Sequence, residues 1–259
     1  VALTILKWGT EEQKRRYLPD LCAGRMLGCF GLTEPNAGSD PASMETTAVK
    51  RGTAWVLDGT KTWISNGTVA DLALVFARTG PGNGHDGIAA FLVDQGTPGL
   101  ATRPITDKLG LRASDTGELI FNNCSVPETA LLGAVGQGFK VAMSALDNGR
   151  YSVAAGCVGI IQGCLNACTE YAKTRRQFGR PIGSFQLVQD MIARMAVDLD
   201  AARLLVFRAG YLKNQGLPNT IETSIAKYFA SEAAGRAATD AVQVFGAYGY
   251  SEETPVARY

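Results

Sequence analysis

Residues 183–206 read GSFQLVQDMIARMAVDLDAARLLV. The apolar positions in this stretch alternate in steps of three and four, at Phe185, Val188, Ile192, Met195, Leu199, Ala202 and Val206. This spacing places them on one face of an α-helix, so it predicts a long amphipathic helix over 183–215. A helix with an apolar face that long needs other helices to cover it.

Two further helices are predicted on either side of this one, over 138–174 and 220–247. The second carries a stripe of small residues suited to close helix–helix approach: Ala226, Ala230, Ala233, Ala237, Ala241 and Val244. Three long helices in succession make up most of an antiparallel bundle, and a fourth is expected after Tyr259.

The first of these helices contains nineteen consecutive uncharged residues, 151–169. That length approaches what a membrane span requires. However, Ser152, Gln162, Asn166 and Thr169 fall within an arc of about 100° at 100° per residue. A polar stripe on an apolar cylinder is typical of a packed core helix, so no membrane span is expected.

The sequence before the bundle has strand character from about residue 25 to 127. Residues 55–64 form two short runs around Asp58-Gly59, a pattern that predicts a β-hairpin. Further strands are predicted over 72–77, 87–93 and 118–121, separated by Gly, Pro and Asn turns. The sequence therefore predicts an α+β protein: an antiparallel β-sandwich or barrel of about 100 residues, followed by a helical bundle.

Composition excludes several classes of function. Lys and Arg exceed Asp and Glu by 25 − 24 = 1, so general nucleic-acid binding is not expected. The one histidine, His85, lies in a turn-rich stretch, which leaves little for a Ser-His-Asp triad or a zinc site. None of the six cysteines forms CxxC, so free, mostly buried thiols are expected, with no metal site. This thiol usage indicates the cytoplasm or an organelle matrix.

Several segments could carry chemistry, and each also has a structural explanation. The loop 32–41, LTEPNAGSDP, could present backbone N–H groups to a heterocycle or anion, or be an ordinary loop. Trp63 could stack on a flat cofactor or lie in the core. Cations at 173–180 could clamp a phosphate or complement a helix dipole. Arg150 requires an acidic partner or a ligand, and the glycines at 246–249 would let a ligand approach the backbone.

Four motifs occur together and in order: LTEPxAGSD at 32–40, KxWISNG at 61–67, RxxFGxPI at 175–182 and DAVQxFGxxG at 240–249. With them the chain resembles the acyl-CoA dehydrogenase family from about Thr10 to Tyr259. The resemblance implies three domains: the end of an N-terminal helical domain over 1–24, a middle β domain over 25–133, and an incomplete C-terminal helical bundle over 134–259.

The resemblance implies non-covalently bound FAD. By similarity it assigns cofactor contacts to Phe30, Leu32, Thr33, Trp63, Ser65, Arg175, Phe178, Gln186, Gln243 and Gly246. The first five would contact the flavin ring, and the last five would hold the FAD of a neighbouring subunit. A homotetramer built as a dimer of dimers is therefore expected. Ala247 stands where the family often has Gly, a departure close to the expected pyrophosphate site.

The same resemblance implies α,β-dehydrogenation of an acyl-CoA in fatty acid metabolism, with electrons passed to an electron-transferring flavoprotein. Ser39 would contact the CoA portion and Arg150 would lie near the acyl pocket. The catalytic base is not in this chain: most relatives place a Glu in a Tyr-Glu-Gly-Thr segment, expected here after Tyr259. At the alternative position this chain has Gly149, and neither Glu252 nor Glu253 matches a known base position.

Three alternatives remain open at the level of sequence. The acyl group could be carried by an acyl carrier protein in a biosynthetic pathway. The enzyme could be an oxidase that passes electrons to O₂. The absent base also allows a non-catalytic member of the fold that serves assembly or binding.

Overall fold

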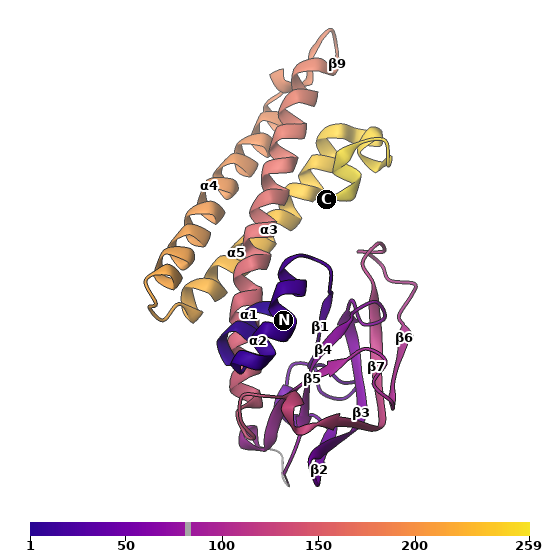
Figure 1. The fold of residues 1–259 in the computed structure, drawn as a ribbon. Helices are drawn as coiled ribbons and strands as arrows, with labels where there is room; N and C mark the ends of the chain where they lie inside the picture. The colour runs from indigo at the N-terminus through magenta and orange to yellow at the C-terminus, as the bar shows by residue number, and fades with distance from the viewer. Residues whose placement is uncertain (81–83) are drawn as a thin grey trace. The chain divides into compact units, whose positions relative to one another are not determined.

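The computed structural model describes residues 1–80 and 84–259. The chain forms two compact units, Val1–Ala145 and Leu146–Tyr259 (Figure 1). The division falls inside the long helix α3 (Gly138–Thr174). The limits 1–24, 25–133 and 134–259 that the resemblance implies are those of family domains and not of compact units, and they stay a prediction.

The first unit begins with two helices, α1 (Ala2–Trp8) and α2 (Glu11–Cys22). Thr10 and Gln13 form a reciprocal capping box at the start of α2, which satisfies two backbone N–H groups there. The Gln13 amide also donates to the carbonyls of Thr129 and Leu131, at 2.9 Å each. One side chain therefore both caps the helix and ties it to the sheet.

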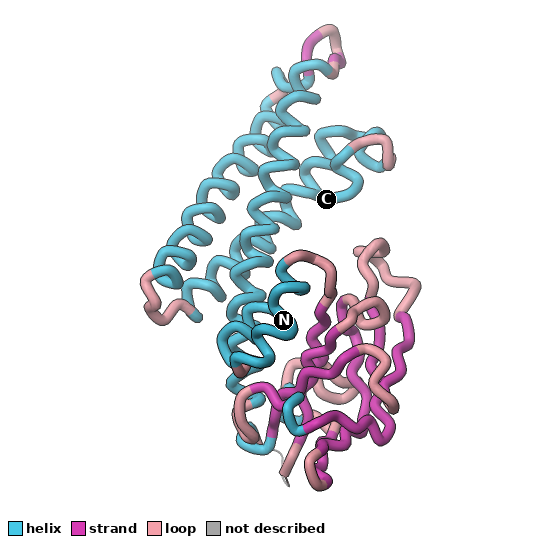
Figure 2. The backbone as a smooth tube through the Cα atoms, in the orientation of Figure 1, coloured by secondary structure: helices cyan, strands magenta, loops and turns pink. Residues whose placement is uncertain are grey.

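An eight-stranded sheet makes up the rest of this unit (Figure 2). Its strands are β1 (Gly28–Gly31), β2 (Thr47–Arg51), β3 (Ala54–Ser65), β4 (Leu72–Arg78), β5 (Ile88–Asp94), β6 (Leu100–Pro104), β7 (Thr116–Pro127) and β8 (Leu131–Leu132). The order is β6-β7-β3-β2-β4-β5-β8, with β1 beside β4. Most pairs are antiparallel, as predicted, whereas β1 and β2 each run parallel to β4. Every residue of β4 is buried, so this strand is the centre of the core.

The predicted hairpin at Asp58-Gly59 is wrong. Residues 54–65 form one continuous strand, and the turn lies earlier, at Gly52-Thr53, where Arg51 pairs with Ala54. Gly59 has φ +142° beside a register shift against β7. A Cβ there would lie 2.7 Å from the Thr46 Cα. The glycine is needed for an irregularity and a close approach within a strand, which Asp-Gly does not distinguish from a turn.

The second unit contains the predicted helices. These are most of α3, together with α4 (Gln186–Asn214) and α5 (Thr220–Phe245). The apolar seam of α4 and the alanine stripe of α5 lie in one core cluster with the buried face of α3. The cluster includes Ile161, Met195, Leu199, Ala230 and Ala233. A short hairpin of β9 (Arg176–Gln177) and β10 (Arg180–Pro181) joins α3 to α4.

Among the described helices, α3 alone is long and apolar enough to cross a membrane by length and composition. Its Ala154, Ile161, Cys164 and Cys168 are fully buried in the bundle core. One face of α3 therefore packs as the core helix that the sequence predicted.

All six cysteines are free, and of these only Cys22 is exposed. Burial raises the pKa of Cys29 and Cys168 to about 12, and that of Cys124 and Cys164 to about 11. The prediction of free, mostly buried thiols is thereby confirmed: four are buried, and Cys157 is partly buried.

We expect iodoacetamide to alkylate Cys22 first in the native protein, because the thiolate is the nucleophile and burial suppresses it elsewhere. Peptide mass mapping over a time course measures this order, and the unfolded protein supplies the reference rates. Labelling of Cys164 or Cys168 as fast as Cys22 would contradict the packing of α3 in the bundle.

Candidate functional site

The first unit brings together the two segments that the sequence assigned to the flavin ring. Phe30 lies in β1, and Leu32 and Thr33 follow directly; Trp63 and Ser65 lie at the end of β3. The Thr62 N–H donates to the Thr33 carbonyl at 2.9 Å. The Phe30 ring packs on Phe76, with ring centroids 5.1 Å apart. Phe30 is half-buried in this packing, and Thr33 is partly exposed.

Trp63 is the most unusual residue of this corner. It has φ +58° within a strand, at a bulge between Lys61 and Ile64, and its side chain is 62% exposed. An aromatic residue in the left-handed region is strained, and such strain clusters at functional sites. The alternative of a core tryptophan is wrong for Trp63, and the buried tryptophan of this sheet is Trp55, which packs on Phe91.

The turn after Trp63 is held by Asp115. Its carboxylate accepts hydrogen bonds from the Thr68 amide at 2.9 Å and the Thr68 hydroxyl at 2.6 Å, and its carbonyl accepts from the Asn66 N–H at 3.0 Å. Ser65 is exposed beside this fixed turn. A hydroxyl and an indole therefore stand on a rigid strand end, which is the placement that a binding site needs.

A buried ion pair that the sequence analysis missed lies under this corner. Lys61 and Glu34 are 0% and 4% exposed, with Nζ 2.7 Å from Oε1. Burial lowers the pKa of Lys61 to about 8 and Glu34 opposes that shift, so the lysine is largely protonated at neutral pH. Burial alone would raise the pKa of Glu34, but Lys61 and hydrogen bonds from Thr46 and Glu45 hold it below its usual range. The sequence indicates this ion pair only in that Glu34 and Lys61 lie within two of the four motifs, LTEPxAGSD and KxWISNG.

Ser39 lies in the loop that follows Glu34. This loop begins with a tight turn in which Glu34 and Ala37 exchange backbone hydrogen bonds. Ser39 and its neighbours Gly38 and Asp40 are exposed. The structure thus presents Ser39, the residue that the resemblance assigns to the CoA portion, at the surface.

The second unit carries the other assigned residues on two turns. Phe178 and Gly179 are the two residues that connect β9 to β10, with φ values of +52° and +76°. Two consecutive positive φ angles are characteristic of a type I′ hairpin turn. The Phe178 side chain is 92% exposed at this tip. An aromatic residue held outward on a strained turn favours a ligand or partner over a role in the core.

Arg175 and the end of α5 lie close together. The Arg175 guanidinium lies 5.7 Å from the ring centroid of Tyr248, in the turn that follows Gly246. Gly246 caps α5 with φ 62° and ψ −137°, a conformation that glycine alone adopts readily. Gln243 is exposed in the last turn of α5, and Gln186 is exposed as the first residue of α4.

Arg150 is far from this group. It precedes Arg175 by 25 residues along α3, which corresponds to roughly 38 Å at 1.5 Å per residue. Its guanidinium binds the Asp147 carboxylate at 2.6 Å, and Asp147 also accepts from the Thr220 hydroxyl at 3.0 Å. Arg150 already has an acidic partner in Asp147, so its charge does not by itself indicate a bound ligand. One flavin ring cannot touch both arginines.

These observations fit a bound FAD. The exposed indole of Trp63 and the hydroxyls of Thr33 and Ser65 suit the edge of a flat, polar ring system. Arg175 beside a glycine-only turn suits a pyrophosphate, because a guanidinium pairs with phosphate and the backbone can approach closely. Among the described residues, no group of three or more His, Cys, Asp or Glu side chains could hold a metal ion.

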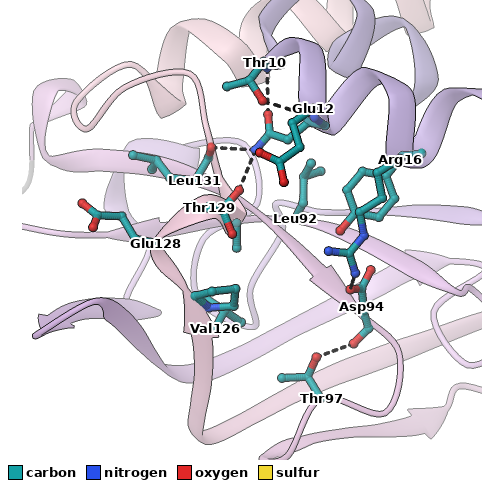
Figure 3. Close-up of a pocket in the computed structure, with 14 residues that line it drawn as sticks. Thr10, Glu12, Arg16, Leu92, Asp94, Thr97, Val126, Glu128, Thr129 and Leu131 are labelled. Carbon is teal, nitrogen blue, oxygen red and sulfur yellow. Dashed lines mark hydrogen bonds and ion pairs between the residues drawn. The ribbon is translucent and has the colours of Figure 1, made fainter.

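A separate hollow of about 300 Å³ lies between α2 and the sheet (Figure 3). Several of its polar side chains already have partners: Arg16 lies 2.5 Å from Asp94, and the Gln13 amide donates to the carbonyls of Thr129 and Leu131. Burial, and to a smaller extent the charge of Asp94, raises the pKa of Tyr17 to about 12. The hollow lies where α2 packs on the sheet, and none of the residues assigned to the cofactor or the substrate lines it.

Comparison with known families gives three consecutive matches. Residues 1–25 match the acyl-CoA dehydrogenase N-terminal domain, residues 29–124 the middle domain and residues 136–259 the C-terminal domain. Glutaryl-CoA dehydrogenase of Desulfococcus multivorans is 46% identical over all of this chain and 67% of its own length. An acyl-CoA dehydrogenase of Bacillus subtilis is 48% identical over 98% of the chain and 67% of its own length. The chain thus spans about two thirds of these relatives.

Solved structures agree with this result. Butyryl-CoA dehydrogenase of Megasphaera elsdenii superposes with a TM-score of 0.96 at 46% identity, over 99% of this chain and 67% of that one. A chain in a structure of the electron transferring flavoprotein of Acidaminococcus fermentans gives 0.97 at 48%, over 100% and 68%. The prolyl acyl carrier protein oxidase AnaB gives 0.96 at 36%, over 99% and 68%.

Proposed function

The chain belongs to the acyl-CoA dehydrogenase family, and on that premise we propose that it binds FAD and removes hydrogen from the α and β carbons of a short acyl-CoA. The observation that carries this proposal is the strained, exposed Trp63 beside Thr33 and Ser65. Asp115 holds the turn that follows this strand end, and a strand end fixed in this way is suited to serve as a platform for a flat cofactor. The names of its relatives favour butyryl-CoA and glutaryl-CoA as the first substrates to test.

When bound, FAD accepts the hydride that leaves the β carbon. In this proposal Trp63 covers the ring system and excludes water, while the hydroxyls of Thr33 and Ser65 orient its polar edge by hydrogen bonds. Ser39 contacts the CoA portion, and Arg150 lies beside the acyl pocket, where Asp147 fixes its orientation. Each of these roles is binding or orientation, which sets the geometry of the reacting carbons.

The α proton requires a base, and we place that base outside these 259 residues. Gly149 has no side chain, and Glu252 and Glu253 are exposed near Tyr259. Glu34 is buried against Lys61, with a lowered pKa, whereas a catalytic base in an apolar pocket has a raised one. A carboxylate supplied by sequence after Tyr259 meets that requirement.

We further propose a homo-oligomer in which Arg175, Phe178, Gln186, Gln243 and Gly246 hold the FAD of a neighbouring subunit. The distance of roughly 38 Å between Arg150 and Arg175 along α3 supports this division. Exposed apolar side chains on α4 and α5, such as Leu204, Phe207 and Tyr228, supply contact surface for a further copy. An electron-transferring flavoprotein is the proposed acceptor, in line with one of the superposed structures. The relatives of this chain come from bacteria and from mammalian mitochondria, which favours a location in the cytoplasm or in an organelle matrix.

The test is an anaerobic visible spectrum of the intact protein before and after excess butyryl-CoA, and separately glutaryl-CoA. We expect a flavin band that bleaches within the mixing time of a manual assay, because substrate reduces the cofactor without O₂. A protein purified without flavin, and unable to bind added FAD, would contradict the proposal and favour a non-catalytic role.

A second candidate is a dehydrogenase or oxidase of an acyl group on a carrier protein, favoured by the likeness to AnaB at 36% identity. The two candidates differ in the substrate that bleaches the band. Bleaching by a butyryl carrier protein and none by butyryl-CoA would select this one. Rapid return of the band in air would then identify an oxidase.

A further inference from the structure

The strongest unexplained feature is the Lys61–Glu34 ion pair. Of the ion pairs among the described residues, it is the one in which both side chains are less than 5% exposed. Removing two charges from water is costly, and apolar side chains of similar size often give equal or greater stability. Stability of the core therefore does not account for this pair, whereas the segment that it binds does suggest a role.

The pair holds the Leu32–Glu34 segment against β3. Lys61 Nζ donates to the Leu32 carbonyl at 3.1 Å as well as to Glu34. The next residue of β3, Thr62, donates its N–H to the Thr33 carbonyl at 2.9 Å. Three consecutive residues of the segment are thus bound to two consecutive residues of β3, the strand that carries Trp63.

Glu34 extends the same arrangement to the far end of the loop that carries Ser39. Its carboxylate accepts from the backbone N–H groups of Glu45, at 2.5 Å, and Thr46, at 3.0 Å. Arg78, also buried, donates to the carbonyls of Ala42 and Met44. The two ends of the loop are therefore fixed by buried charged groups, while its middle is exposed.

We propose that Lys61 and Glu34 are positioning residues, whose buried pair sets the backbone of Leu32 and Thr33 at the distance from Trp63 that the flavin ring requires. This inference rests on the proposed function. The pair does not touch the cofactor; it acts through the segment that does. A charged pair suits this task because its hydrogen bonds are directional, whereas apolar packing would let the segment shift.

The main test compares Lys61→Met with a matched control, Leu132→Ala, in the intact protein. Lys61→Met leaves Glu34 buried without its partner and the Leu32 carbonyl without a donor. Leu132 is fully buried in β8, with its strand paired to β5, away from the loop. Both variants should lower the Tm of the apoprotein. FAD affinity is then measured by flavin fluorescence titration at a temperature where both apoproteins are folded.

We expect the dissociation constant of FAD to rise at least tenfold in Lys61→Met and less than threefold in Leu132→Ala. Hydrogen exchange should speed up at the amides of residues 32–46 in Lys61→Met alone. Equal FAD affinity in the two variants would overturn the proposal and leave the pair a purely structural role. A wild-type protein that binds no FAD would instead overturn the proposed function, and this inference with it.

A second variant covers the case in which Lys61→Met does not fold. Lys61→Met combined with Glu34→Gln removes both charges and keeps one side-chain oxygen, which can accept from one of the two backbone N–H groups that Glu34 binds, those of Glu45 and Thr46. We expect it to recover at least half of the Tm lost on Lys61→Met, while the FAD dissociation constant stays more than threefold above that of the wild type. A return to wild-type affinity would show that the charges themselves do not position the segment.

Discussion

Replacing Gly59 by alanine is expected to cost roughly 4 kcal/mol of folding free energy, from overpacking together with backbone strain. The added Cβ would lie 2.5 Å from Thr46 Oγ1 and 2.7 Å from its Cα, at a φ of +142°. The apparent Tm should fall by about 8 °C or more. Thr46 also donates its N–H to Glu34, so FAD affinity should fall with stability.

Gly52→Ala is the matched control for this change. Gly52 lies in the turn between β2 and β3, with φ +62°. No neighbouring atom lies within 4 Å of the Cβ that alanine would add. It should cost about 1 kcal/mol, the usual penalty of a left-handed alanine. Thermal unfolding of both apoproteins measures the difference. Equal losses would mean that β2 and β3 can separate freely at Gly59, against the geometry described.

Arg175→Ala is expected to weaken FAD binding roughly 100-fold, because loss of a charge-assisted contact to a phosphate costs about 2 to 4 kcal/mol. Lys173→Ala removes a cation two residues away that already binds Glu170 at 2.7 Å. That variant should change the dissociation constant less than threefold. Fluorescence titration of the two apoproteins distinguishes a specific contact from general positive charge, since the second explanation predicts similar losses.

Mixed oligomers test where the Arg175 contact is made. If Arg175 serves a neighbouring subunit while Trp63 serves its own, a pair of Arg175→Ala and Trp63→Ala subunits has one doubly damaged site and one intact site. Subunit exchange between the two variants should then restore activity that neither has alone. No gain on mixing would mean that Trp63 and Arg175 of one subunit serve the same FAD, and it would contradict the proposed division.

The helices were predictable because their signal is periodic. The seam from Phe185 to Val206 and the alanine stripe of α5 required no knowledge of the partner surface, and both lie in the core. The strands were predicted less well, since Asp58-Gly59 has the composition of a turn but lies inside β3. Whether a glycine bends a chain or admits a neighbouring backbone depends on residues far away in sequence, here Thr46.

The residues of the site were predictable from motifs, but their conformations and contacts were not. KxWISNG identified Trp63 and Ser65, but no local pattern indicates that Trp63 takes a positive φ at a bulge. The partner of Lys61 lies 27 residues away, and its burial depends on the complete sheet. Reading the cations at 173–180 only as complements of a helix dipole also misses the packing of Arg175 on Tyr248, which depends on how α5 ends.

The outward-facing Phe178 has a consequence for the life of the protein in a cell. In the proposed oligomer Phe178 is covered only once FAD and a neighbouring subunit are bound, so a subunit without them leaves this side chain, 92% exposed on its strained turn, in water. Binding of a ligand to the folded state alone stabilises that state by mass action. We therefore expect the FAD-free protein to be degraded faster than the FAD-bound protein, a difference that limited proteolysis of the two forms measures.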